Sequence, residues 1–280
     1  MAMNKIKLAL VMIIWGSLGV FTRAIPLSAL SLAYLRALIA LPVLLVVMKM
    51  KKADQAQWRL LIPYLISGVL LGFGWLTLFY GFKHTSISSA VIIYNMCPVY
   101  VMLLAPLVLK ETISKIQMAV ICISFLGLFL IVGHNLAEGY GYMGLINRSI
   151  KVRVNNQIAT FAQILAAMIV LLPFVLIDGN ISTVVHLDTI AVIYTILLGV
   201  LHTGVAYTMF FSVYAHLESV EIVSYSFLEP LFGILLSVIF IGETLTFIQI
   251  IGGILILGST YLGETFKDRN LSIEKYPTQI

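Results

Sequence analysis

Two stretches of this chain decide its fold: LFYGFKHTSISSAVIIYNMCPVYVMLLAPLVLKETISKIQ at 78–117 and FFSVYAHLESVEIVSYSFLEPLFGILLSVIFIGETLTFIQ at 210–249. They align without a gap at a constant offset of 132 residues, so that Pro98 falls on Pro230. Each copy is a long apolar stretch interrupted by a short acidic turn, which is the pattern of two consecutive membrane helices. An internally duplicated bundle of membrane helices is typical of secondary transporters. The duplication therefore predicts a carrier.

The composition predicts a polytopic membrane protein. Hydrophobic residues make up 61% of the 280 residues and charged residues only 10%, with a mean hydropathy of +1.06. A soluble domain is about half apolar and a quarter charged, so this chain is too apolar to be one. We therefore expect the lipid bilayer to be the partner that covers most of its apolar surface. The net charge of +5 does not indicate nucleic acid, because the basic residues lie in short loops beside apolar spans. Cys97 and Cys122 fall within spans and have neither metal-ligand nor disulfide spacing.

Apolar stretches of about twenty residues, the length that crosses a bilayer as a helix, recur along the chain. Nine are clear, at about 6–25, 29–48, 60–80, 86–109, 116–133, 157–177, 188–210, 218–241 and 246–264.

The positive charges predict ten helices instead of nine. With the N-terminus in the cytoplasm and a tenth helix between Gly133 and Arg148, 14 of the 17 Lys and Arg residues are cytoplasmic. Only Arg23 and Lys83 are then outside, and Arg36 lies within a span. Nine helices would leave 8 on each side, against the positive-inside rule. The stretch 134–147 is nevertheless too short and polar to cross, so we expect most of helix six to be absent and this stretch to form a loop or stub.

Several segments resemble the EamA-type transporters of the drug/metabolite superfamily. They are WGSLGVFTRAI at 15–25, YLRALIALP at 34–42, the turn KETISKIQ at 110–117 and FLEPLFGILLSVIFIGETLTFIQIIGGILILG at 227–258. The resemblance implies an all-α bundle of 5+5 inverted repeats, both termini in the cytoplasm, and export or exchange of small metabolites or drug-like molecules across the cytoplasmic membrane. The repeats would be 1–133 and 134–266, followed by a cytoplasmic tail at 267–280.

Ionisable and aromatic residues inside the spans are the candidates for a substrate site, because such groups are costly in hydrocarbon and usually face a cavity or a partner. Glu221, Tyr225 and Glu229 follow each other at helical spacing on one face. In the pairwise comparison of the halves, Arg36 corresponds to Gln163. The cavity candidates are Trp15, Arg36, Tyr94, Asn95, His202, Tyr207, Tyr225 and Glu229.

Each candidate also has a purely structural interpretation. Arg36 could pair with a carboxylate, Glu229 could be a buried packing residue beside Pro230, and His202 could be a packing histidine instead of a proton relay. Trp15 and Tyr207 could face lipid.

No enzyme motif competes with the transporter hypothesis. The chain has no phosphate-binding Gly-rich loop, no HExxH and no GxSxG, so we expect no catalytic residue, cofactor or metal, and no ATP hydrolysis. The expected partner is a small-molecule substrate, and the sequence does not indicate which oligomeric state the protein has. Two alternatives stay open: a non-transporting variant that lacks helix six, and a membrane-embedded sensor or enzyme.

Overall fold

The computed structural model describes residues 2–50, 58–84, 86–87, 155–214, 216–217 and 228–242, with short pieces between 118 and 127, 222 and 226, and 244 and 258. Every regular element in these ranges is helical. The first half contains α1 (Ala2–Gly16), α2 (Leu18–Ala24), α3 (Ala29–Met50) and α4 (Trp58–His84). The second half contains α9 (Asn156–Asp178), the 3-10 helix η1 (Asn180–His186), α10 (Thr189–Gly199), the π-helix η2 (Val200–Val205), α11 (Ala206–Tyr214) and α13 (Leu228–Ile241).

Five helical segments of the described chain are long and apolar enough to cross a membrane. They are Met3–Ala24, Ala29–Met50, Leu60–His84, Asn156–Asp178 and Thr189–Val213. The corresponding spans that the sequence predicts are confirmed, as is the helical-bundle fold class. About half of the predicted span at 246–264 is described, and the predicted spans at 86–109 and 116–133 lie mostly outside the described residues. So do the boundary between 133 and 134 and the stretch 134–147.

Local signals in the sequence set both ends of α9 and the start of α10. The Asn155 side chain accepts a hydrogen bond from the Gln157 amide at 2.9 Å and caps α9, and Gly179 ends that helix with a φ of 68°. Asp188 caps α10 through the Ala191 amide at 2.7 Å. These are the side-chain cap and the left-handed glycine stop that helix termini require.

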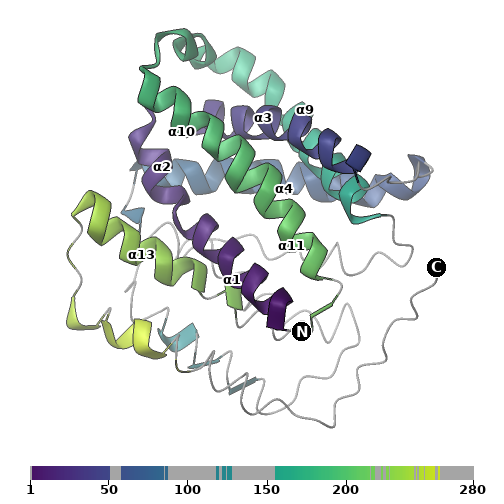
Figure 1. Cartoon of the computed structure of the whole chain (residues 1–280). Helices are drawn as coiled ribbons and strands as arrows, with labels where there is room; N and C mark the ends of the chain where they lie inside the picture. Colours follow the sequence, from purple (N-terminus) through teal and green to yellow (C-terminus); the bar gives the residue numbers. More distant parts are fainter. Residues whose placement is uncertain are drawn as a thin grey trace.

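The helices pack as two groups. The helices α3, α4, α9 and α10 surround an apolar core. In the second group, α1 lies between α13 and α11 (Figure 1). At one end of the bundle, the last turn of α4 meets the segment that leads into α3. Lys83 Nζ donates to the Ile25 carbonyl at 2.7 Å, and Arg23 Nε donates to the Phe82 carbonyl at 3.1 Å. The end of α4 therefore lies beside the start of α3, and the two helices are antiparallel.

Glycine contacts show how the two halves are related. In α4, a Cβ added at Gly68 would overlap the Gln163 backbone, and one at Gly72 would press on Ala167 and Val170 of α9. The residue numbers in α4 and those of the contacted residues in α9 rise together, so the two helices run parallel.

The second half repeats this contact with the partners exchanged. In α10, Gly199 lies against Arg36 and Ile39 of α3, and Gly204, in η2, lies against Val43. The helix formed by α10, η2 and α11 therefore runs parallel to α3. Since α3 and α4 are antiparallel, α3 is also antiparallel to its repeat equivalent α9. These four helices are thus related by an axis perpendicular to their length, as an inverted repeat requires. The same contacts confirm the correspondence of Arg36 with Gln163.

Candidate functional site

The site is built around the π-helical turn η2, which lies in the middle of the predicted span at 188–210, helix eight of the ten-helix arrangement. A π-turn spaces backbone hydrogen bonds five residues apart, and such turns are frequent at functional sites. His202 and Thr203 lie in this turn and are completely buried. His202 Nδ1 lies 3.1 Å from the Leu197 carbonyl, and Thr203 Oγ1 donates to the Leu198 carbonyl at 2.9 Å. Because a carbonyl can only accept, Nδ1 carries the proton in the His202–Leu197 contact.

Arg36 of α3 reaches this turn from the first half of the chain. Its side chain is 1% exposed. Nε donates to Thr203 Oγ1 at 2.7 Å, and Nη2 donates to the His202 carbonyl at 3.3 Å. The guanidinium carbon also lies 4.2 Å from the centre of the Trp75 ring and 5.3 Å from that of Phe79. Hydrogen bonds and cation–π contacts together offset the cost of burying this charge.

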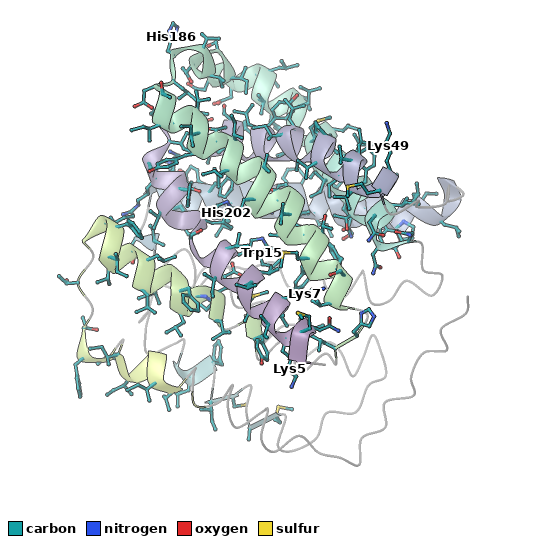
Figure 2. All side chains as sticks on the ribbon, in the orientation of Figure 1. Lys5, Lys7, Trp15, Lys49, His186 and His202 are labelled. Atoms are coloured by element: carbon teal, nitrogen blue, oxygen red, sulfur yellow. The ribbon has the colours of Figure 1, made fainter. Side chains whose placement is uncertain are left out.

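Helix one supplies two further side chains near Ser17, the residue between α1 and α2. α1 ends at Gly16 and α2 begins at Leu18, with Ser17 between them. Ser17 Oγ lies 2.8 Å from His202 Nε2 and 2.7 Å from the Ile14 carbonyl. The Trp15 indole donates to the His202 carbonyl at 2.9 Å. Figure 2 shows Trp15 and His202 facing each other in the middle of the molecule. The discontinuities of helices one and eight thus lie at the same level.

Aromatic rings surround this polar centre. Trp15 contacts Tyr207 and Phe210 with ring centroids 5.0 and 5.1 Å apart. The Trp75 indole donates to the Tyr207 hydroxyl at 3.2 Å. Trp75 and Tyr207 are separated by 132 residues, the offset of the sequence duplication. The hydrogen bond therefore joins repeat-equivalent positions, which places the centre at the junction of the two halves.

Glu229 brings a carboxylate to this region from the first turn of α13. It is 9% exposed, and the Arg36 guanidinium attracts it electrostatically. Its place is fixed by the crossing of α1 and α13, where a Cβ at Gly16 would lie 2.9 Å from the Glu229 carbonyl oxygen and 2.8 Å from Phe232 Cβ. The close crossing therefore requires glycine at position 16.

The structure brings together five of the eight residues that the sequence singled out. Trp15, Arg36, His202 and Tyr207 belong to one contact network, and Glu229 lies within its electrostatic reach. Tyr225 is half-buried against an apolar cluster of α1 and α11 that Trp15 also contacts. Tyr94 and Asn95, together with Glu221, lie outside the described residues. Within the described ranges, no group of three His, Cys, Asp or Glu side chains could hold a metal ion.

The sequence analysis missed four members of the network: Ser17, Trp75, Phe79 and Thr203. One of them carried a detectable signal, because extending the duplication three residues toward the N-terminus pairs Trp75 with Tyr207. Ser17 and Thr203 carried none, since single hydroxyl residues in an apolar span are common.

Antiparallel repeats of apolar spans, with charged and aromatic side chains at their junction, define the architectural class of an inverted-repeat membrane transport protein. The EamA-like transporter family matches residues 5–133 and 138–263 of this chain. The chain therefore belongs to the EamA-like transporter family and is a multi-pass membrane protein.

Two relatives extend over nearly the whole chain. An uncharacterized transporter of Bacillus subtilis, YxxF, is 28% identical over 92% of this chain and 88% of its own length. An uncharacterized transporter of Archaeoglobus fulgidus is 25% identical over 92% of this chain and 96% of its own length. A solved structure described only as the crystal structure of a protein superposes with a TM-score of 0.66 at 15% identity. The superposition includes 94% of this chain and 97% of the chain in the solved structure, which shows a shared fold.

Proposed function

We propose that this chain is a secondary transporter that exports or exchanges small metabolites or drug-like molecules across the cytoplasmic membrane. The observation that carries the proposal is the buried Arg36 guanidinium. It is held by groups of both repeats, at the level of Ser17 in helix one and of the π-turn in helix eight. An ionisable group buried in a membrane bundle is a functional-site hypothesis by default, and transporters built from inverted repeats place their substrates at the interface between the repeats.

The chemistry of the centre supports a small substrate that has both a polar and an apolar part. Arg36 offers a cation and Glu229 a carboxyl group, while Trp15, Trp75 and Tyr207 offer aromatic faces. Because the sequence has no ATP-binding loop, transport is facilitated or driven by an ion or substrate gradient.

The orientation that we propose places the N-terminus in the cytoplasm. Figure 2 shows Lys5, Lys7 and Lys49 toward one end of the bundle and His186 at the other. The lysine-bearing end is the cytoplasmic one by the positive-inside rule, in agreement with the charge count over the whole sequence.

Flux into proteoliposomes tests the proposal. Purified protein would be screened for uptake and counterflow of amino acids, nucleobases and amphipathic amines, and Arg36→Gln should reduce the flux of any transported compound by at least tenfold. Lys49→Gln is the matched control, because it removes a positive charge from the end of the same helix. Specific binding without flux in either direction would overturn the carrier and favour the sensor alternative. Equal loss of flux in both variants would remove Arg36 from the substrate site.

A further inference from the structure

The helix formed by α10, η2 and α11 carries one residue more than its repeat equivalent α4. The two glycines of α4 that pack on α9 are four residues apart, at positions 68 and 72. The two that make the equivalent contacts with α3 are five residues apart, at positions 199 and 204. Their partners are in strict correspondence: Gln163 and Val170 on α9 match Arg36 and Val43 on α3, each at an offset of 127. The packing surfaces are equal, so the extra residue lies between the glycines.

The extra residue is absorbed as the π-turn Val200–Val205. An insertion of one residue into an α-helix either rotates everything beyond it by about 100° or is taken up locally as a π-bulge. Here both flanks keep their contact faces, because Gly199 and Gly204 still meet α3 as Gly68 and Gly72 meet α9. α4 is a continuous α-helix through the matching region. The insertion therefore changes the chemistry of the turn and leaves the packing around it unchanged.

The chemical difference falls on Arg36 and its repeat equivalent. Gln163 Nε2 donates to Ser67 Oγ at 3.2 Å, next to the first glycine of α4. Arg36 Nε donates instead to Thr203 Oγ1, next to the second glycine, and Nη2 reaches the carbonyl of the adjacent His202. That carbonyl also accepts the Trp15 indole. The π-turn thus gathers donors from α1 and α3, where α4 has only an ordinary α-helical turn.

We propose that this inserted residue is a positioning device of the transport site. The π-turn holds the Arg36 guanidinium over the face of Trp75, through the Thr203 hydroxyl and the His202 carbonyl, and so makes the two halves of a symmetric scaffold chemically unequal. The transport part of this inference rests on the function proposed above. The positioning part rests on the contacts alone and can be tested without any substrate.

The test uses tryptophan fluorescence in a Trp58→Phe background, where the remaining Trp15 and Trp75 both belong to the centre. Deletion of Leu201 leaves the glycines four apart, as in α4, and should convert the π-turn to an α-turn. Thr203→Val removes one hydrogen bond to Arg36, and Thr203→Ser should restore it. Thr208→Val is the matched control, because the Thr208 hydroxyl donates to the Gly204 carbonyl of its own helix at 2.7 Å.

We expect the Leu201 deletion and Thr203→Val to shift the emission maximum and increase acrylamide quenching, with Thr203→Ser and Thr208→Val unchanged from the background. For a transported compound, Thr203→Val should raise KM on the order of tenfold with the maximal rate little changed, as for the loss of a hydrogen bond to a charged group. Unchanged emission in both perturbing variants would overturn the inference, as would equal shifts in Thr203→Val and Thr208→Val.

The two proposals fail in different ways. Shifted emission in a protein that transports no compound would keep the positioning role of the π-turn and overturn the transport function. The opposite result is flux that is lost in Arg36→Gln, with no change of emission maximum or KM in Thr203→Val or the Leu201 deletion. That result would keep the transport function and overturn the positioning role of the π-turn.

Discussion

Gly68→Ala is expected to separate the two helices on which the repeat interface depends. A Cβ at position 68 would lie 2.7 Å from the Gln163 Cα atom and still closer to the Gln163 carbonyl oxygen. Carbon atoms in contact are normally about 3.5–4.0 Å apart, so α4 and α9 would have to move apart by roughly 1 Å. Both obstacles are backbone atoms, and no rotamer change can relieve them. Such a gap forfeits about a quarter to a half of the dispersion energy of the facing atoms.

We therefore expect a cost of about 3 kcal/mol, the upper end of the range for overpacked sites. By the usual scaling this lowers the melting temperature by roughly 6–12 °C, measured by intrinsic fluorescence during heating in detergent. Gly72→Ala is the matched control, because its Cβ would lie 3.2 Å from its nearest neighbours and needs only a few tenths of an ångström. If Gly68→Ala melts as high as Gly72→Ala, the close packing of α4 on α9 is wrong.

Three further results are expected. Gly16→Ala should cost about 1–3 kcal/mol in a thermal melt, because its Cβ would press on Phe232 and on the α13 backbone, and a melt equal to wild type would contradict the close crossing of α1 and α13. Glu229→Gln keeps the size of the side chain but cannot release a proton, so it should abolish flux driven by a pH gradient in proteoliposomes; undiminished flux would reassign Glu229 to packing. Lys151→Cys, in a background without the two native cysteines, should react with an impermeant maleimide from the cytoplasmic side, whereas reaction from outside would mean that the second half is inverted.

The sequence predicts the scaffold well because the scaffold depends on signals that repeat. Apolar length locates the five described spans, and the duplication indicates two halves. The charge bias then gives the second half the opposite orientation to the first. The correspondence of Arg36 with Gln163 also followed from the sequence alone, and the glycine contacts of α4 and α10 confirm it. Each of these signals is spread over many residues, so that no single contact decides it.

The helix discontinuities could not be predicted, because each depends on a partner far away in the chain. The sequence predicts one span at 6–25, but the structure interrupts it at Ser17, whose hydroxyl meets His202 185 residues later. No proline marks that position, and the neighbouring Gly16 and Gly19 are explained by close contacts with α13 and Ile87, so they do not identify a turn. The π-turn was hidden for a related reason: a one-residue insertion becomes visible only when the glycines on either side are matched through the helices they contact.

The comparison of the halves separates the residues that build the bundle from those that give it chemistry. The glycines at the α4–α9 and α10–α3 contacts occur in both repeats, and exchanging the repeats would leave their packing unchanged. The polar residues beside them differ: Arg36 in one repeat corresponds to Gln163 in the other, the first donates to a threonine and the second to a serine, and one turn holds an extra residue. In the carrier that we propose, the repeated packing supplies one scaffold in two opposite orientations. Arg36 in one half corresponds to the neutral Gln163 amide in the other, so the charge belongs to one half while the glycine packing around it belongs equally to both.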